Sequence, residues 1–284
     1  MKRILFHIAA LVISIPAFSQ TTNDLFDIDP KDQEYFVHNI KSIQMFLDRF
    51  NFSRDLLGKE IDSHPADPKA REFFVQDRLV SILSAFDYNW VKSASAEEQQ
   101  LIREFVKKVN DPNNPVFLEF NDPDWYAELT YDATSGGEKI DLTVVAYNFV
   151  GGNGGSAWTI RSVKSQALPL LSSTDKLNIV LPPNSDGTDF INLRQDLSND
   201  QELKKLIAQG TSLSPFFELL LQKKITLNHI RDIRYHLLQV ENYILTVEEF
   251  RREKNNSGWL ISKIQKATGQ TKIQYRKNIL HISN

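Results

Sequence analysis

Apolar and polar positions along the first hundred residues repeat with the period of an α-helix. The clearest stripe follows the helix-start signal Asp29-Pro30 and has apolar residues spaced by four and three: Phe36, Ile40, Ile43, Leu47 and Phe50. Such spacing predicts an amphipathic helix with one buried face. The Asp67-Pro68 pair and the capping box Ser95-Ala-Glu-Glu98 predict two more helices. We therefore expect helices up to about residue 110.

Beyond that point the apolar period falls to that of a β-strand. Four segments are rich in β-branched and aromatic residues: Val116–Phe120, Trp125–Tyr131, Ile140–Val150 and Ala157–Lys164. The glycines of Ser135-Gly136-Gly137 and of residues 151–155 can supply the positive φ angles of hairpin turns. Because helices precede strands and do not alternate with them, the pattern predicts an α+β fold with an antiparallel sheet.

The second half of the chain repeats this order. Residues 166–189 contain Pro169, Pro182, Pro183 and Gly187 among small polar residues, and we expect them to form a linker. Two short helices are expected around Leu203–Ile207 and after Pro215. Strands are expected at Ile233–Val240, Tyr243–Phe250 and Trp259–Lys266, with a last one at Ile273–Ile282. A chain of 284 residues favours two domains, here 20–165 and a smaller one at 190–284.

A repeated motif links the two halves. Trp158-x-Ile160-x-x-Val163 matches Trp259-x-Ile261-x-x-Ile264, and each follows a Leu-Thr-Val strand, at 142–144 or 245–247. The last apolar residue breaks strict alternation, which predicts a β-bulge after the isoleucine. We interpret the match as two copies of one plan, helices followed by a curved antiparallel sheet. Chance similarity between two hairpins is the alternative.

The plan resembles the NTF2-like superfamily, the cone-shaped fold shared with ketosteroid isomerases and polyketide cyclases. Its members carry N-terminal helices over a bent antiparallel sheet, and a late strand often contains Trp-x-Ile, as at Trp158/Ile160 and Trp259/Ile261. The resemblance covers about residues 30–165 in order and length, and implies a second, truncated copy after the linker. The stretch FVHNIKSIQMFLDRFN also resembles uncharacterised secreted proteins of this kind. The resemblance to this family does not imply a function, because the fold hosts enzymes, binding modules and interaction domains.

The start of the chain predicts export. Met1-Lys2-Arg3 is basic, residues 4–15 are mostly apolar, and Ala17-Phe18-Ser19 offers a cleavage site before Gln20. We expect residues 1–19 to be a signal peptide and the mature protein to reach the periplasm or exterior of a Gram-negative-type bacterium. A buried N-terminal helix is the alternative. No other segment has the roughly 20 apolar residues of a membrane span.

Composition excludes several classes of partner and site. The chain has no cysteine, which excludes disulfides and thiolate metal sites. A net charge of −3 gives no electrostatic footprint for nucleic acid. Neither His229 with His236 nor His64 with Asp67 has metal-ligand spacing, and the glycines at 151–155 lack the Gly-Lys-Ser/Thr of a phosphate loop. We expect no cofactor or metal and assign no catalytic residue.

Basic residues between 231 and 254 are interleaved with glutamates. Arg231 and Arg234 belong to this stretch, together with Glu241 and Glu248. Opposite charges on neighbouring strands stabilise a sheet by pairing across it. The pattern therefore predicts a solvated strand face with cross-strand ion pairs.

Aromatic residues with polar groups mark the candidate ligand site. Two strands that we expect to be neighbours carry Trp125, Tyr126, Tyr131 and Tyr147. The carboxylate of Asp141 lies on the same strand face as Tyr147. Such clusters suit a glycan or a small amphipathic ligand, and packing in the core is the alternative. Tyr35 and His38 on the first helix are candidates for lining a pocket. We expect the first domain to carry any site and the second to support it.

Three functions remain open at this point. The first is an exported, non-enzymatic binding protein for a small molecule, a glycan or a protein partner. The second is a structural or assembly module, and the third is a hydrolase or isomerase that uses the cone pocket. A closed cavity with a perturbed carboxylate would favour the enzyme, and an open aromatic surface would favour binding.

Overall fold

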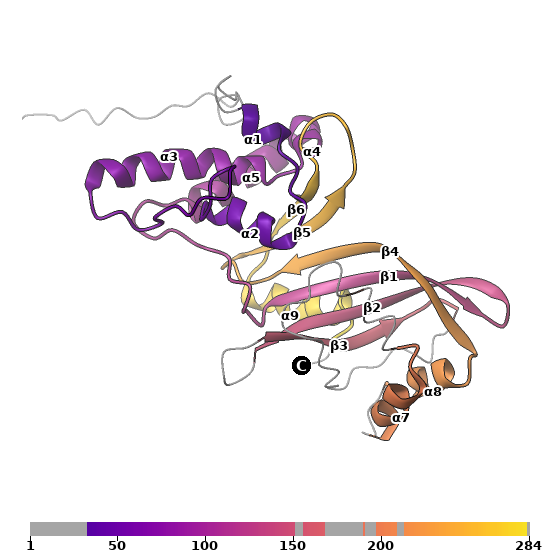
Figure 1. Ribbon diagram of the computed structural model, residues 1–284. Helices are drawn as coiled ribbons and strands as arrows, with labels where there is room; N and C mark the ends of the chain where they lie inside the picture. Colours follow the sequence, from indigo (N-terminus) through magenta and orange to yellow (C-terminus); the bar gives the residue numbers. More distant parts are fainter. Residues whose placement is uncertain (1–32, 151–155, 168–189, 191–196, 209–212, 283–284) are drawn as a thin grey trace, which may run out of the picture.

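A computed structural model describes residues 33–150, 156–167, 190, 197–208 and 213–282 (Figure 1). This part is α+β, as expected, with eight helices and six strands. The helices are α1 (Gln33–Val37), α2 (Ile43–Asn51), α3 (Pro68–Ser84), α4 (Tyr88–Ser93), α5 (Ala96–Val109), α7 (Asp200–Ala208), α8 (Ser214–Leu221) and α9 (Gly269–Asn278). The strands are β1 (Trp125–Ser135), β2 (Glu138–Val150), β3 (Ser156–Lys164), β4 (Ile225–Leu237), β5 (Tyr243–Phe250) and β6 (Gly258–Lys266). The expected signal peptide, the glycines at 151–155 and most of the expected linker lie outside the described residues.

The N-terminal apolar stripe forms two helices and not one. α1 ends at Val37, and α2 begins after Ser42, whose Oγ accepts a hydrogen bond from Met45 N. Between them the backbone of Ile40 bonds to the start of β6, through Ile40 N to Ser257 O and Trp259 N to Ile40 O. Ile40 is still 1 % exposed, so burial of the stripe did not require a continuous helix.

Two helix starts follow their sequence signals. The Asp67 carboxylate accepts a hydrogen bond from Ala70 N at the start of α3, which confirms the Asp-Pro signal. At α5, Ser95 and Glu98 make both bonds of the predicted capping box. These signals are local, so no distant residue was needed to interpret them.

Two expected strands are absent from the described sheet. Residues 116–120 stay outside it, because the side-chain amide of Asn51 bonds both the N–H and the C=O of Leu118 at 2.8 Å. The last expected strand, Ile273–Ile282, is replaced by helix α9 and the segment after it. Thr268 caps α9 by accepting a hydrogen bond from Thr271 N, and alternation of apolar residues is interrupted by Arg276, Lys277 and Asn278.

The six strands form one open antiparallel sheet in the order β3-β2-β1-β4-β5-β6. Each half of the chain contributes a three-stranded meander, and the two meanders join through β1 and β4. In the β1–β4 register Ala127 faces Tyr235, with Tyr126 facing His236 on one side of this pair and Glu128 facing Arg234 on the other. The Trp-x-Ile strands are therefore the two edge strands of one sheet. The described residues do not form the two separate sheets that two tandem cones would require.

The predicted bulges are present at matching positions. Arg161 in β3 and Ser262 in β6 have no partner in the register, and each lies three residues after the motif tryptophan. The Leu-Thr-Val match is shifted, however. Val163 faces Val144, the third residue of its tripeptide, whereas the matching Ile264 faces Leu245, the first of its own.

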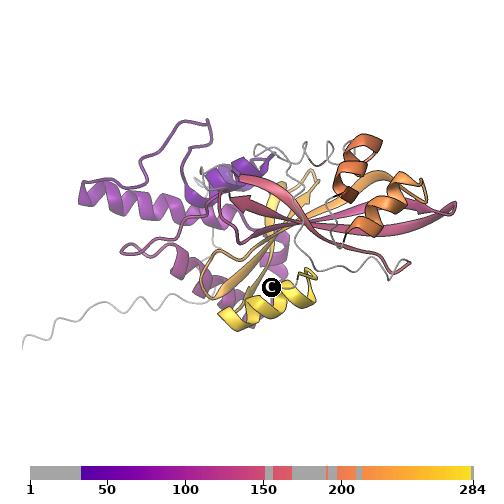
Figure 2. The same ribbon diagram turned by 90° about the horizontal axis from the view of Figure 1, so that it is seen from below.

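The sheet has an inner face filled with aromatic side chains and an outer face that is largely polar. On the inner face the Tyr235 ring centroid lies 6.0 Å from that of Trp158 and 5.0 Å from that of Trp259. Trp125 and Phe190 pack against the same group. Helices α1–α5 gather at the β5–β6 end of the sheet, while α7 and α8 lie near the far end of β4 (Figures 1 and 2). Helix α9 lies on the outer face.

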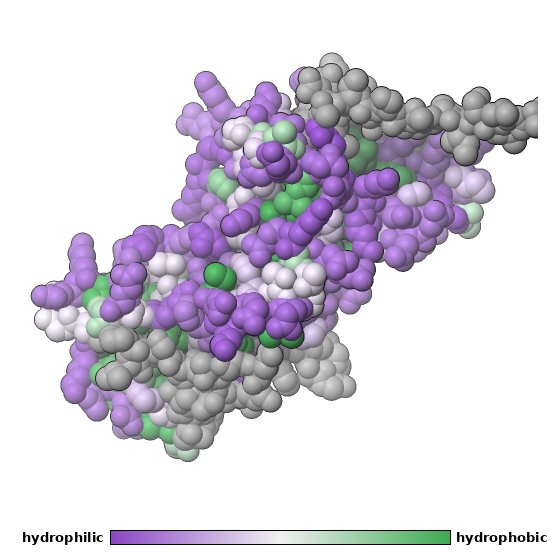
Figure 3. All heavy atoms as spheres, turned by 180° about the vertical axis from the view of Figure 1, so that it is seen from behind, coloured by the Kyte–Doolittle hydropathy of each residue, from purple (hydrophilic) through white to green (hydrophobic). Residues whose placement is uncertain are grey.

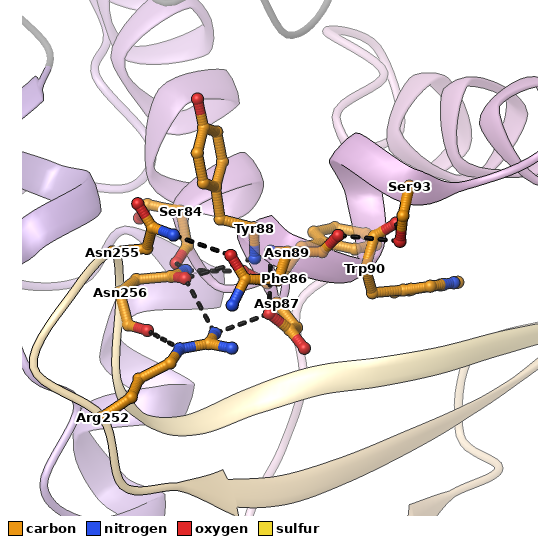
Figure 4. A network of polar contacts seen from close by, with 10 residues as sticks. All are labelled: Ser84, Phe86, Asp87, Tyr88, Asn89, Trp90, Ser93, Arg252, Asn255 and Asn256. Carbon is orange, nitrogen blue, oxygen red and sulfur yellow. Dashed lines mark hydrogen bonds and ion pairs between the residues drawn. The ribbon is translucent and has the colours of Figure 1, made fainter.

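The loop between β5 and β6 is locked onto the α3–α4 junction by Asn256 (Figure 4). Its Nδ2 donates to Ser84 O and Phe86 O, and its Oδ1 accepts from Tyr88 N. Arg252 donates to Asn256 O and pairs with Asp87. Asn256 has no exposed surface, so these polar groups have no access to water as an alternative partner.

Replacing Asn256 with alanine is expected to destabilise the protein by about 2–3 kcal/mol, because buried backbone groups would lose their partners. Urea unfolding measures this effect. Asn255→Ala is the comparison variant: Asn255 makes only an exposed bond to Asn89 Oδ1, and its left-handed φ of +65° favours asparagine over alanine, so a loss of about 1 kcal/mol is expected. Equal losses in the two variants would contradict the proposed locking role.

Candidate functional site

The five candidate ligand residues do not form one surface. Trp125 and Tyr131 lie on the inner face with no exposed surface, so they belong to the core. Tyr126, Tyr147 and Asp141 lie on the outer face, where Tyr126 and Tyr147 are directly paired across β1 and β2. The expectation that these strands are neighbours is confirmed, whereas the expectation of a single aromatic surface is not. Successive side chains along a strand point to opposite faces of the sheet, and this alternation divides the five candidates between the two faces.

The outer-face tyrosines are engaged within the protein. Arg161 stacks over the Tyr147 ring at 4.1 Å, and the Tyr126 hydroxyl accepts a hydrogen bond of 2.9 Å from Arg276 Nε. Burial raises the pKa of Tyr126. Tyr126 is therefore bonded to α9, and Tyr147 packs against the apolar cluster that contains Leu280 and Ile282.

The two pocket candidates on the first helix lie in the helical layer. The Tyr35 ring packs under the Arg49 guanidinium, and its carbonyl accepts a hydrogen bond from Arg49 Nη1 at 3.3 Å. His38 follows α1 and is half-buried. Neither residue reaches the outer-face hollows described next.

A large open hollow lies on the outer face, over β1, β2 and β4. We call it the Arg231 hollow; its volume is about 1150 Å³, and the residues that matter here are Thr130, Asp132, Asp141, Lys164, His229 and Arg231. Of the five sequence candidates it contains Asp141 alone. The lining is polar and charged, which suits a ligand rich in hydroxyl or charged groups.

Arg231 is the centre of this hollow. It is the extra residue of a β-bulge, because Thr130 faces Asp232 while Tyr131 faces Ile230. Its Nη1 bonds Asp132 Oδ1 at 3.0 Å and Asp141 Oδ1 at 2.8 Å. The bond to Arg231 lowers the pKa of Asp141 and raises that of Arg231. Its Nε and Nη2 have no hydrogen-bond partner among the described residues.

His229 joins the same group of side chains. Its Nε2 lies 3.1 Å from Asp132 Oδ2, on the side of the carboxylate opposite Arg231. Asp132 is thereby held by two partners from β4. All of these groups remain at least a third exposed, so they stay within reach of a ligand from solvent.

A second hollow lies further along the same face, over β4, β5 and β6. We call it the Arg234 hollow; its volume is about 490 Å³, and it is lined by Glu128, Arg234, His236, Thr246, Glu248 and Tyr275, among others. An ion-pair chain runs along its base, from Lys164 to Glu128 at 3.0 Å, to Arg234 at 3.3 Å and to Glu248 at 2.6 Å. This chain confirms the predicted cross-strand ion pairs. Lys164 lines the Arg231 hollow and pairs with Glu128, which lines the Arg234 hollow.

His236 lies between the Arg234 hollow and helix α9. It is 2 % exposed, and its Nδ1 lies 2.9 Å from the Tyr275 hydroxyl. Its Nε2 is buried without a partner among the described residues. Burial lowers the pKa of His236 to about 4, so the ring is neutral at pH 7.

The described residues add no metal or membrane element. No group of three or more His, Asp or Glu side chains in this part of the chain could hold a metal ion. No described helix is long and apolar enough to cross a bilayer. Comparison with protein-family models, curated proteins and solved structures finds no match.

The sequence missed most residues of the Arg231 hollow. Asp132 and His229 carried no motif, and Arg231 was interpreted only as one member of a charged strand. The bulge in β4 is what brings Arg231 to Asp132 and Asp141. Its only trace in the sequence is a local loss of apolar alternation between His229 and Ile233.

Proposed function

We propose that the protein is an exported, non-enzymatic binding protein that receives a polar small molecule or glycan in the Arg231 hollow. The proposal combines the sequence evidence for export with an open hollow whose charged groups come from four strands, β1 to β4. The ligand would bond directly to the unoccupied edge of the Arg231 guanidinium. The NTF2-like resemblance remains part of the proposal as a fold hypothesis only.

The observation that carries the proposal is the orientation of Arg231. Exposed ion pairs contribute little to stability, typically less than about 1 kcal/mol, so stability alone gives no reason for this arrangement. Two carboxylates hold the guanidinium through Nη1, while Nε and Nη2 bond to none of the described residues. A side chain held in this way loses less conformational entropy on binding a ligand, which favours affinity.

Catalysis is supported less well than binding. In the described part of the inner face, where a cone pocket would lie, Trp125, Trp158 and Tyr235 are fully packed. Burial raises the pKa of Asp122, but this carboxyl group precedes β1 and lines neither hollow. A closed cavity with a perturbed carboxylate is therefore not found among the described residues.

A screen of the mature protein against a glycan array and a metabolite panel tests the proposal. For any ligand found, Arg231→Ala should weaken binding by about 10- to 100-fold, because charge-assisted hydrogen bonds would be lost. The ligand should bind the wild type with a measurable Kd by isothermal titration calorimetry.

Arg251→Ala is the matched control. Arg251 is also an exposed arginine paired with a carboxylate, Glu249, but it lies outside both hollows. The Arg251→Ala variant should bind the ligand with the same affinity as the wild type. Equal affinity of the wild type and Arg231→Ala would place the ligand elsewhere and contradict the proposed site.

A further inference from the structure

Helix α9 borders the Arg234 hollow through Tyr275, and none of its own residues is buried. Its side chains lie over the sheet, yet no residue between Gly269 and Asn278 is buried. Most helices dock through an apolar stripe, and α9 has none. The apolar attachment comes from the segment after it, where Leu280 and Ile282 are buried. Helix α9 is therefore held mainly by polar contacts.

Three residues of α9 make the polar contacts that hold the helix on the outer face. Tyr275 bonds to His236, and Arg276 bonds to Asp124 and to the Tyr126 hydroxyl. Lys272 Nζ donates to Leu238 O and Val240 O. Polar contacts of this kind open at lower free energy than the core, and the apolar burial that opposes opening comes from Leu280 and Ile282 in the segment after the helix.

The segment after α9 separates the two hollows. Lys164 Nζ donates to Ile279 O at 3.2 Å, and Ser162 Oγ donates to Leu280 O at 2.8 Å. Ile279 lines the Arg234 hollow, whereas His281 lines the Arg231 hollow. Displacing this segment would join the two hollows along the ion-pair chain of Lys164, Glu128 and Arg234.

We propose that residues 269–282 are an acid-sensitive lid, whose release enlarges the Arg234 hollow and joins it to the Arg231 hollow. The proposal rests on the proposed function, since it describes access to the same outer face. The contact that makes the lid sensitive to acid is His236 with Tyr275. When α9 is docked, the buried imidazole has no solvent for a charged form, and when α9 is displaced the ring reaches water.

The groups around His236 do not supply a counter-charge that removes this sensitivity. Glu128 from β1 and Glu248 from β5 favour the charged imidazole, while Arg234 from β4 and Lys164 from β3 disfavour it. Tyr275 from α9 and Tyr126 from β1 are neutral. Two of these charges raise the pKa of His236 and two lower it, and burial is the largest cause of its lowered pKa, so protonation favours the open lid.

The sign and size of the effect follow from linkage. The docked His236 has a pKa of about 4, against 6.5 for an exposed histidine. The open form therefore binds a proton that the closed form lacks between these values. Opening should change little above pH 6.5 and should rise on acidification, by about 150-fold at pH 4 and toward about 300-fold at lower pH.

Hydrogen exchange of the full chain at pH 7 and pH 4.5, corrected for intrinsic rates, tests the lid. We expect residues 269–282 to lose protection at pH 4.5 while β1 and β4 remain protected. Tyr275→Phe should loosen the lid already at pH 7. His236→Gln should remove the pH response, because glutamine does not titrate.

His229→Gln is the matched control. His229 is an exposed histidine of the other hollow, and its loss should leave the response of residues 269–282 intact. Unchanged protection of this segment at pH 4.5, simultaneous loss in β1 and β4, or an equal effect of His229→Gln would overturn the lid. These outcomes are independent of ligand binding, so they are distinguishable from a failure of the Arg231 site.

Discussion

Replacing Gly258 with alanine is expected to destabilise the protein by more than about 3 kcal/mol. Gly258 has a φ of +89°, and a Cβ there would lie 2.0 Å from Ile40 O. That oxygen is fixed, since it accepts the hydrogen bond from Trp259 N at 2.9 Å. The clash is with backbone, so relief would require the N-terminal segment to leave β6. Urea unfolding measures the loss.

The Gly137→Ala variant measures the cost of backbone strain alone, without the steric clash expected at Gly258. Gly137 has almost the same φ, +87°, but an added Cβ would meet nothing within 4 Å. It should cost about 1–2 kcal/mol, the usual penalty of a left-handed backbone with a side chain. If Gly258→Ala cost no more than Gly137→Ala, the close approach of Ile40 would be without consequence.

Truncating either motif tryptophan to alanine is expected to cost about 3–5 kcal/mol. Trp158 is 1 % exposed and Trp259 is 5 % exposed, and both contact Tyr235. Because they share a partner, the two losses should not add, and a double-mutant cycle should show coupling. Chemical denaturation of the two single variants and the double variant measures the coupling.

The number of unfolding transitions gives a second test of the same packing. One continuous sheet with one aromatic core predicts a single cooperative transition by calorimetry. Two independent domains predict two transitions and strict additivity of the tryptophan effects. Phe73→Ala is the control, since Phe73 is 65 % exposed and should have little effect. Two transitions would contradict the shared core.

Local signals were readable from the sequence, and long-range pairing was not. The Ser95 capping box, the positive φ of Gly136 and Gly137, and the bulges after Ile160 and Ile261 depend on neighbours a few residues away. The joining of β1 to β4 depends on residues about a hundred positions apart, for which a single sequence has no signal. The helix break before Ser42 has the same origin, because Ile40 bonds to Ser257 and Trp259.

The candidate site was only partly readable for a different reason. Alternation along β1 places Trp125, Ala127, Leu129 and Tyr131 on one face, and that face is apolar. The alternation already predicted burial of Trp125 and Tyr131, and the aromatic content of the strand outweighed it in our interpretation. Arg231 was not assignable, because a bulge changes which face a side chain occupies and is not visible in composition.

The central pairing of β1 with β4 also constrains the order in which the protein can fold. During synthesis, β1–β3 are complete about 60 residues before β4 begins at Ile225, and β1 then has one hydrogen-bonding edge without its final partner. Exposed edges of this kind recruit strands from other chains. Pairing between distant segments is also slow to form. The newly made N-terminal half is thus the stage most vulnerable to aggregation, and a chaperone that covers β1 until β4 arrives would protect it.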